Sequence, residues 1–316
     1  MPAVSAPRQP VGTGFALRYP LPWTDLAAIV RAAEAAGYGS VFLPEIAGRD
    51  ALVTLGALAG ETRDLFLGTG ILPISSRTTV LTAMAAATVH ERSGGRLVLG
   101  LGTGGLGRGA LPLLREEVLE LRTLLEGGSL QREGETLRLS LDPGSPVPIW
   151  VSALGPKAMR LAGEVADGVL MNWCPPERVP AAREAVAGGA EAAGRDPSAI
   201  AVAVYVRAWV GEDKASAMPA LKAAVAQYAS YPGYARQFDE VGLGSEAAAA
   251  AAAHRAGRTQ DVPESLVRAV CAVGDAARAR IEAYREAGAD LPVVYPVASG
   301  PAAASIERTL SALAPA

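Results

Sequence analysis

The stretch Leu65–Gly107, LFLGTGILPISSRTTVLTAMAAATVHERSGGRLVLGLGTGGLG, decides the fold because it predicts a strand, a helix, a second strand and a glycine-rich loop in succession. Its first strand, Leu65–Leu72, is continuously apolar, as expected for a strand buried on both faces of a parallel sheet. Gly68 and Gly70 interrupt it, which indicates a bulge, a strained peptide or another surface packed against the backbone. The second strand, Leu97–Leu101, also runs into glycines. Two neighbouring strands that open into bare backbone indicate a flat ligand at their C-terminal ends.

The alternation of strand and helix continues on both sides of this stretch. Apolar runs predict strands at Gly14–Leu17, Ser40–Pro44, Leu65–Pro73, Leu97–Leu101, Pro148–Ala153, Gly168–Met171, Ile200–Val210 and Leu291–Tyr295. Most of the segments between them have helical spacing, and repeated strand–helix units require a parallel sheet. Eight such units in a chain of 316 residues match a (β/α)8 TIM barrel better than an open sheet.

We expect one domain across residues 1–316, since no linker or change of composition divides the chain. Residues 1–12 lack an apolar signal core and are interpreted as a loose leader. The segment 213–272 is less regular, and we interpret it as an insertion before the last strand that shapes the substrate pocket. Alternation in Thr136–Leu141 predicts a small ribbon.

Charge and composition argue against several classes of protein. The net charge is −3 without a basic run, which gives no sign of a nucleic-acid partner, and no apolar run approaches the ~20 residues that span a bilayer. Cys174 and Cys271 lie far apart without metal-ligand spacing, so we expect free thiols in a reducing cytoplasm. His90 and His254 are placed at a helix end and beside an alanine run, and we predict no metal site.

The loop Gly100–Gly105 fits the pattern G-x-G-x-x-G. A dinucleotide-binding fingerprint requires an acidic residue at the end of the next strand, whereas the acids here, Glu116, Glu117 and Glu120, fall inside a predicted helix. Two interpretations remain for the glycines. Either they only turn the chain in a tight barrel loop, or they let bare backbone approach a flat ring or a phosphate.

The segment Ser152–Lys157 follows the fifth strand and opens a helix. Small residues at a helix N-terminus leave N–H groups unpaired, and these groups and the helix dipole favour an anion, to which Lys157 adds charge. The alternative is a plain junction with a surface lysine.

Side chains at the C-terminal ends of other strands are candidates for chemistry, because barrel active sites lie there. Glu45 ends the second strand, and a carboxylate in an apolar mouth can act as acid or base, although a salt bridge to Arg49 or Arg77 is the alternative. Asn172 and Trp173 end the sixth strand, where an amide and an indole can wall and hydrogen-bond a ligand. Ordinary packing of the indole is equally open, and Tyr205 and Arg207 lie in the seventh strand.

Three stretches together resemble the bacterial luciferase-like superfamily: GYGSVFLPE (Gly37–Glu45), LGTGILPISSRTTVLTAMAAATVHERSGGRLVLGLGTG (Leu67–Gly104) and VPIWVSALGPKAMRLAGEVADGVLMNW (Val147–Trp173). They cover most of the chain between Gly37 and Trp173, in the order and spacing of that superfamily. Its members use either reduced FMN in monooxygenation or the deazaflavin coenzyme F420 in hydride transfer. The segment Ser152–Gly168 resembles the deazaflavin-dependent branch more.

The resemblance implies a (β/α)8 barrel whose mouth holds the flat ring. Many members carry a non-proline cis peptide in the third strand, which here matches the bond between Gly70 and Ile71. The implied contacts are Gly70, Ile71 and Leu72 at the ring, Gly102, Thr103 and Gly104 along the cofactor side chain, and Ala153, Leu154, Gly155 and Pro156 at its phosphate. We add Asn172 and Trp173 from their place at the mouth.

Two departures from the family narrow the expected reaction. The deazaflavin-dependent sugar-phosphate and alcohol dehydrogenases have Asp-His where this chain has Glu45-Ile46, and a glutamate where it has Gly105. We therefore expect an F420-dependent reductase of an activated C=C or C=N bond, with Glu45 as the catalytic acid. The alternatives are an FMNH2-dependent monooxygenase and a non-catalytic flavin-binding or partner subunit. The resemblance also implies a homodimer, to which Thr78–Val89 contributes, and a small-molecule substrate.

Overall fold

The strands form a closed parallel barrel in the computed structural model, which describes residues 12–18, 20–107 and 109–315. Within these residues the barrel strands are β1 (Gly14–Ala16), β2 (Ser40–Leu43), β3 (Phe66–Thr69), β5 (Leu97–Gly102), β8 (Ile149–Ser152), β9 (Gly168–Asn172), β10 (Ala201–Trp209) and β12 (Leu291–Pro296). Pairing of β12 with β1 and of β9 with β10 closes the ring. The predicted TIM barrel is confirmed. The predicted leader, apart from Gly12, lies outside the described residues.

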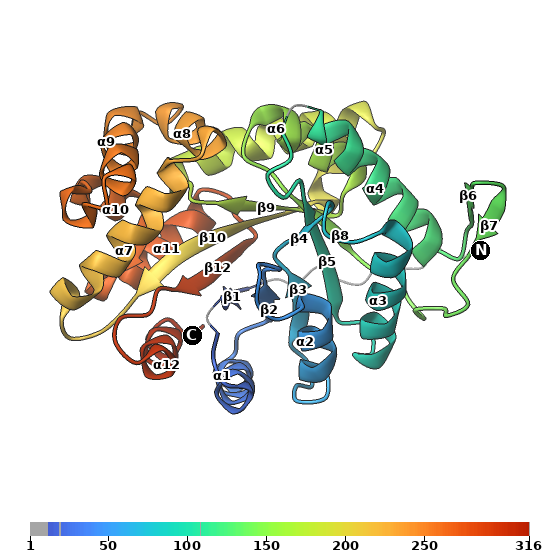
Figure 1. The fold of residues 1–316 in the computed structure, drawn as a ribbon, viewed down its shortest axis with the longest axis horizontal. Helices are drawn as coiled ribbons and strands as arrows, with labels where there is room; N and C mark the ends of the chain where they lie inside the picture. Colours follow the sequence, from blue (N-terminus) through green and yellow to red (C-terminus); the bar gives the residue numbers. More distant parts are fainter. Residues whose placement is uncertain (1–11, 19, 108, 316) are drawn as a thin grey trace.

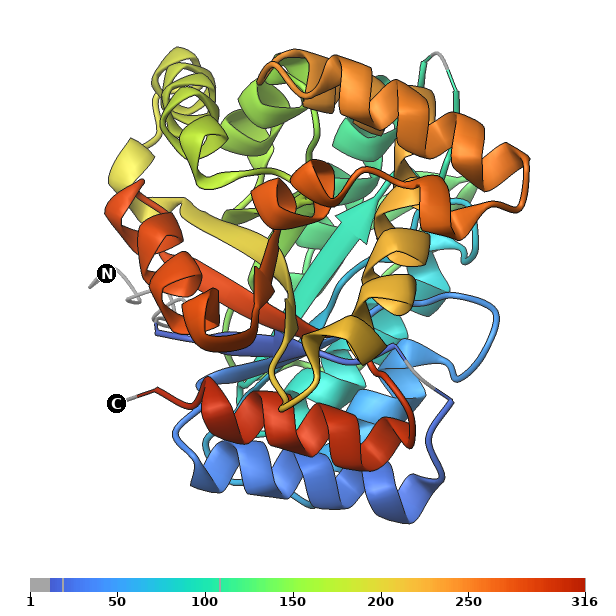
Figure 2. The ribbon, with the colours of Figure 1, turned by 90° about the vertical axis from the view of Figure 1, so that its left-hand side faces the viewer.

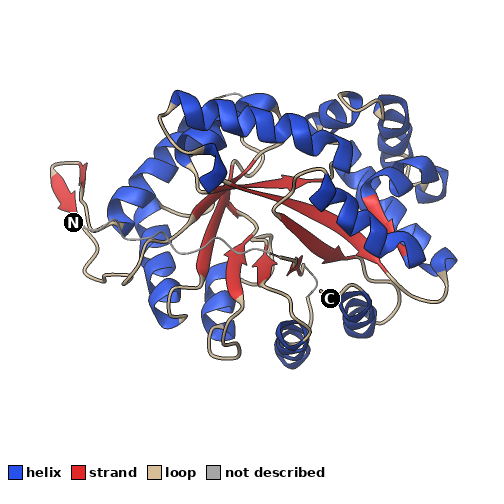
Figure 3. Cartoon of the chain, turned by 180° about the vertical axis from the view of Figure 1, so that it is seen from behind, coloured by secondary structure: helices blue, strands red, loops and turns tan. Residues whose placement is uncertain are grey.

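Helices surround the barrel (Figure 3). They are α1 (Trp23–Ala35), α2 (Ala51–Leu58), α3 (Thr79–Arg92), α4 (Ala110–Leu125), α5 (Pro156–Val165), α6 (Val179–Ala192), α11 (Ala277–Glu286) and α12 (Ala302–Ala312). Their apolar faces share one buried core with the outer faces of the strands. The first and last helices, α1 and α12, lie side by side, so the two ends of the barrel sequence meet (Figure 2). Within the described residues, no helix is long and apolar enough to cross a bilayer.

A second core, drawn from strand residues alone, fills the inside of the barrel. Its large rings are Phe42, Trp150, Tyr205 and Tyr295, whose neighbouring centroids lie 5.6–6.1 Å apart. Gly68 pairs with Phe42 across the strands, and a Cβ on Gly68 would lie 2.3 Å from that ring. The glycine that weakens the third strand therefore makes room for an aromatic ring of the second.

The third predicted strand, Leu65–Pro73, is divided into β3 and the short β4 (Leu72–Pro73). The peptide bond between Gly70 and Ile71 is cis, as the resemblance implied. Thr69 bridges the break, since its hydroxyl donates to the Gly100 carbonyl and accepts from the Gly100 N–H, both at 2.8 Å. The strand thus bulges where it reaches the mouth of the barrel.

The segment 213–272 forms a layer of helices beside the mouth, at the upper left in Figure 1. It consists of α7 (Lys214–Ala229), α8 (Pro232–Asp239), α9 (Gly244–Arg255), α10 (Glu264–Val270) and the unpredicted strand β11 (Cys271–Val273), which pairs with β10. These helices have an apolar core of their own, into which Trp173 and Trp209 project from the barrel.

The predicted ribbon exists, but it begins six residues earlier than the sequence indicated. It is a hairpin of β6 (Leu130–Arg132) and β7 (Glu135–Leu137), and it stands away from the barrel in Figures 1 and 3. Its turn residues, Glu133 and Gly134, both have positive φ, as a two-residue hairpin turn requires.

Candidate active site at the barrel mouth

One side of the mouth presents bare backbone. At Gly102, which ends β5, a Cβ would lie 2.5 Å from the Ser152 hydroxyl and 2.7 Å from Ile71 Cδ1. At Gly104, where φ is +60°, a Cβ would lie 2.5 Å from the Pro73 side chain. Thr103 lies between the two glycines and is partly exposed. Close packing against Ser152, Ile71 and Pro73 therefore excludes side chains at both glycines.

The bulge between β3 and β4 lies next to this loop and is held from three sides. The Gly70 N–H donates to the Leu43 carbonyl at 2.9 Å, and the Ile71 carbonyl accepts from the Glu45 N–H at 3.1 Å. From inside the barrel, the Tyr205 hydroxyl donates to the Gly70 carbonyl at 3.3 Å. Gly70, Ile71 and Leu72 thus form a fixed ledge at the mouth.

The N-terminus of α5 opens onto the same side. Gly155 is its N-cap with extended backbone, and Pro156 follows in the first turn. No described side chain caps this end, so its first N–H groups have no protein acceptor. A Cβ on Gly155 would meet nothing within 4 Å, so space remains beside these groups. Ala153 and Leu154 approach the helix from β8, and the Leu154 carbonyl accepts from Arg178.

The opposite side of the mouth is built from side chains. Asn172 and Trp173 leave β9 in a sharp turn, and Trp173 is a non-glycine residue with φ of +52°. Gln237 from α8 fixes this turn, since its Nε2 donates to the carbonyls of Asn172 at 2.9 Å and Trp173 at 2.7 Å. The Asn172 Nδ2 donates to the Tyr234 hydroxyl at 2.8 Å. The helices of segment 213–272 therefore position the end of β9.

Aromatic rings surround a buried guanidinium on this side. The Arg207 Cζ lies 3.9 Å from the Tyr295 ring centroid and 4.6 Å from that of Trp173. Tyr205 lies one layer deeper, with its ring 5.6 Å from that of Tyr295. Burial raises the pKa of Tyr205 well above its ordinary value, and the neighbouring Tyr295 adds to this, so the hydroxyl stays protonated and donates to the ledge. Trp173 also packs against Tyr228 of α7 at 5.3 Å.

Glu45 lies at the edge of the ledge and is tied to several groups. Its Oε1 accepts from the Ser76 hydroxyl at 3.1 Å, and its Oε2 accepts from the Ala51 N–H at 3.3 Å. Arg77 lies 3.4 Å from Oε2 and also binds Asp50 at 2.6 Å. The salt bridge to Arg77 that the sequence left open is therefore present, whereas Arg49 donates to a backbone carbonyl instead.

These contacts divide the mouth into two sides. The backbone side comprises Gly70–Leu72, Gly102–Gly104 and Ala153–Pro156; the side-chain side comprises Asn172, Trp173, Tyr205, Arg207 and Tyr295. The backbone side offers the ledge at Gly70–Leu72, a loop in which only Thr103 carries a side chain, and the uncapped N-terminus of α5. This donor set suits a flat ring with an anionic tail, because N–H groups at a helix N-terminus bind phosphate.

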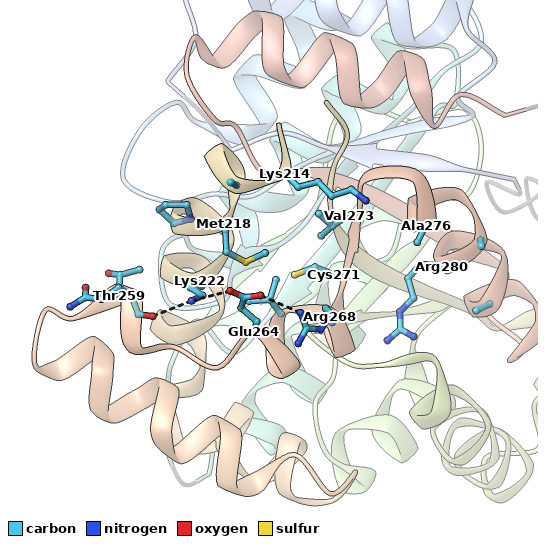
Figure 4. A pocket seen from close by; sticks show the side chains of 16 residues that line it. Lys214, Met218, Lys222, Thr259, Glu264, Arg268, Cys271, Val273, Ala276 and Arg280 are labelled. Atoms are coloured by element: carbon cyan, nitrogen blue, oxygen red, sulfur yellow. Dashed lines mark hydrogen bonds and ion pairs between the residues drawn. The ribbon is translucent and has the colours of Figure 1, made fainter. Parts of the chain in front are cut away.

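A cavity of about 1170 Å³ lies between α7, α10, β11 and α11 (Figure 4), and Cys271, which lines it, pairs with Arg207 across β11 and β10. None of the predicted site residues lines it. Its cations are mostly paired, since Glu264 holds both Lys222 and Arg268 and Asp275 holds Lys214. Cys271 has a free thiol, and burial raises its pKa to about 12.

Four contributors to the mouth are absent from the predicted site. Tyr205, Arg207 and Tyr295 were recognisable as strand residues, and alternation from Val293 places Tyr295 on the inner face of β12. Gln237 lies in the irregular segment, and nothing in its sequence neighbourhood indicates that it reaches the end of β9.

Known proteins resemble this chain in sequence and in fold. The profile of the family described as luciferase-like monooxygenase matches residues 5–291. The chain is 34% identical over 220 residues to 5,10-methylenetetrahydromethanopterin reductase of Methanolobus tindarius, which is 65% of this chain and 67% of that protein. It is 33% identical over 189 residues to F420-dependent hydroxymycolic acid dehydrogenase of Mycobacterium tuberculosis, about half of either chain (53% and 51%).

Among solved structures, the coenzyme F420-dependent tetrahydromethanopterin reductase of Methanopyrus kandleri superposes with a TM-score of 0.80. The superposition covers 95% of this chain and 97% of that one at 24% identity. This likeness shows that the two proteins share a fold.

Proposed function

The chain belongs to the luciferase-like monooxygenase family, and on that premise we propose that it transfers a hydride between coenzyme F420 and a small organic substrate. The observation that carries the proposal is the backbone side of the mouth, which ends in the uncapped N-terminus of α5. A relative that is named F420-dependent supports the choice of cofactor.

Each part of the backbone side has a role in this proposal. Gly70–Leu72 would support the ring, Gly102–Gly104 would lie along the side chain of the cofactor, and Ala153–Pro156 would receive its phosphate. The residues fit at the phosphate end, because the absence of a Cβ atom at Gly155 leaves space beside the uncapped N–H groups of α5. When bound, F420 supplies the two-electron hydride chemistry, and the protein contributes binding, orientation and a proton.

The remaining residues orient the substrate and supply the proton. Tyr205 holds the ledge from below, and Asn172 and Trp173 close the other side of the mouth. Glu45 is the candidate proton donor, because it is the carboxylate at the end of β2. The contacts to Ser76 and Arg77 also give it a structural role. If a Glu45→Gln enzyme keeps the turnover number and the pH profile of wild type, Glu45 is not the proton donor.

We propose reduction of an activated C=C or C=N bond as the direction of the reaction. Ile46 stands where the alcohol-oxidising members have histidine, and Gly105 where they have glutamate, so the groups that would take a proton from an alcohol are missing. Reduction needs mainly orientation and one proton donor. If the purified enzyme oxidises secondary alcohols with F420 faster than it reduces enones or imines, this assignment is wrong.

Titration with cofactor tests the proposal directly. We expect F420 fluorescence to change on addition of protein and to saturate, with FMN binding at least about tenfold more weakly, a difference of about 1.4 kcal/mol. Tighter binding of FMN, together with an oxygenated product from FMNH2 and oxygen, would establish the monooxygenase alternative. If neither flavin binds, the non-catalytic alternative holds.

A homodimer remains our proposal for the assembly. The outer face of α3 exposes Leu81 and Met84, with 48% and 53% of their surfaces accessible, and Val53 of the adjacent α2 is 71% accessible. Apolar side chains gathered on one face indicate an interface. Light scattering should give twice the chain mass of 32.3 kDa, and Met84→Glu should give the monomer; a monomeric wild type contradicts the proposal.

A further inference from the structure

Arg207 is a buried cation without an anion. It is 5% exposed, and the other buried arginine of the described residues, Arg178, is 8% exposed. Arg178 forms an ion pair with Glu240. No carboxylate of the described residues lies within ion-pair distance of Arg207. Burying an unpaired charge costs roughly several kcal/mol of folding free energy. Other groups must therefore stabilise the guanidinium.

The protein compensates this charge only in part. The Arg207 Nη1 donates to the Asn172 Oδ1 at 2.8 Å. The rings of Trp173 and Tyr295 flank the guanidinium at 4.6 and 3.9 Å, a cation–π arrangement worth about 2 kcal/mol when desolvated. Rings and an amide stabilise a cation, but they do not neutralise it.

One complete edge of the guanidinium is left without a partner. Arg207 Nε and Nη2 donate no hydrogen bond to the described residues, and neither atom is among the sealed side-chain atoms that lack a partner. Arg178 Nε, in contrast, is sealed. The Nε–Nη2 edge is the fork that binds a carboxylate through two parallel hydrogen bonds.

The position of this edge connects it with the reaction. Arg207 follows Tyr205 by two residues on the inner face of β10, and the Tyr205 hydroxyl touches the ledge at Gly70. We propose that the substrate carries a carboxylate, which the Nε–Nη2 edge of Arg207 binds. This inference rests on the proposed function, because it places the substrate beside the cofactor ledge.

Binding of a matched pair of probes tests it without turnover. We would titrate the F420-loaded protein with 4-fluorobenzoate and with 4-fluorobenzamide and follow both by fluorine NMR. The two probes share size and ring but differ in charge. Wild type should bind the benzoate at least tenfold more tightly, and Arg207→Met, which keeps length and apolar packing, should bind both equally. Equal binding by wild type, or an unchanged preference in Arg207→Met, overturns the proposal.

Two further variants make the result specific. Arg268→Met removes an exposed cation from the cavity in Figure 4 and should leave the preference unchanged. If it abolishes the preference, Arg268 binds the benzoate and the proposal is wrong. Asn172→Asp supplies a carboxylate beside Nη1 while keeping a partner for Tyr234, and should weaken benzoate binding at least fivefold without affecting benzamide. If Arg207→Met does not fold, the benzoate affinity of Asn172→Asp tests the proposal in its place.

The same titrations separate this inference from the proposed function. If F420 does not bind, the proposed function fails, but the benzoate preference of the cofactor-free protein still reports on Arg207. If F420 binds and the two probes bind equally, the substrate class is wrong and the cofactor assignment stands.

Discussion

The two sides of the barrel mouth are built by opposite means. The backbone side gains its shape from missing side chains, since Cβ atoms at Gly70, Gly102 and Gly104 would each lie within 2.5 Å of a neighbour. The side-chain side is crowded with rings, an amide and a guanidinium, and helices of segment 213–272 hold its turn. The difference teaches that Gly70 and Gly102 tolerate no side chain because protein atoms fill the space around them, whereas the open space at Gly155 admits one.

The largest effect should follow Gly70→Ala, on the backbone side. Its Cβ would lie 1.6 Å from the Tyr205 hydroxyl and 3.2 Å from Phe42 Cβ, inside a filled barrel. Overpacking of a core costs typically up to about 3 kcal/mol, and we expect a loss of this size in the free energy of unfolding, measured by urea denaturation.

Removing the obstructing hydroxyl supplies the control. In Gly70→Ala/Tyr205→Phe the nearest remaining ring atom is Tyr205 Cζ, at 2.9 Å, so a small shift of the ring admits the methyl group. The double variant should recover about half of the lost stability, although Tyr205→Phe alone loses a hydrogen bond worth about 1 kcal/mol. Additive losses would show that the contact is not the cause.

Gly155→Asp should weaken cofactor binding while leaving the fold intact. The new side chain enters open space at an N-cap of suitable backbone and would stabilise α5 by about 0.5–1 kcal/mol. The same carboxylate would occupy the free N–H groups and repel a phosphate. We expect F420 affinity to fall at least about tenfold, or 1.4 kcal/mol, by fluorescence titration.

Gly155→Ala is the matched control, because its methyl group also meets nothing within 4 Å. F420 affinity within about twofold of wild type is expected for it, since neither charge nor capping changes. Equal F420 affinities of Gly155→Asp and wild type would show that the phosphate does not bind at the N-terminus of α5.

The backbone side was largely predictable from the sequence, because backbone without side chains can be recognised there as glycine residues. Gly70 and Gly102 sit in apolar strands, where only a bulge or a close approach explains them. The barrel followed from eight strand–helix units, and the predicted bounds of the strands agree with the structure to within a few residues. The cis peptide between Gly70 and Ile71 came from the resemblance, whereas the glycines alone left a bulge as one of several interpretations.

The side-chain side was predictable only in part, because its contacts join segments that are distant in the chain. Asn172 and Trp173 were identified from their place at a strand end, but Gln237, which holds them, lies more than 60 residues later in an irregular segment. Arg207 is unusual because it lacks an ion-pair partner among the described residues, and a sequence does not show which charged side chains remain unpaired. Strand β11, three residues long, carries too little pattern to detect.

Gln237→Leu should loosen the side-chain side selectively. It removes two hydrogen bonds from a side chain that is 1% exposed, and its Oε1 has no partner to lose. We expect a loss of about 1–2 kcal/mol in unfolding free energy and a several-fold rise in the substrate KM, with F420 affinity unchanged. Gln131→Leu, on the exposed hairpin, should alter neither. Equal losses in F420 and substrate binding would contradict the division of the mouth into two sides.

The smallest effect concerns His90, at the opposite end of the barrel from both sides of the mouth. His90 ends α3, is fully buried and lies 2.9 Å from the Ser145 hydroxyl through Nε2, while Nδ1 has no partner. Burial lowers its pKa below the ordinary value of 6.5, so the folded state keeps the ring neutral where the unfolded chain already binds a proton.

Stability should therefore fall as the pH drops below about 6.5, by up to about 1.4 kcal/mol per pH unit, until the folded-state pKa is reached. Carboxylates add their own acid dependence at lower pH, so the test is the difference between wild type and His90→Gln in urea denaturation from pH 7.5 to 5. The variant should lose less stability over the interval just below pH 6.5, because its side chain does not titrate. Parallel curves would show that His90 is not the group responsible. In both proteins F420 affinity at pH 7.5 should be equal, because the ring lies at the end of α3 and both sides of the mouth are formed by the C-terminal ends of the strands.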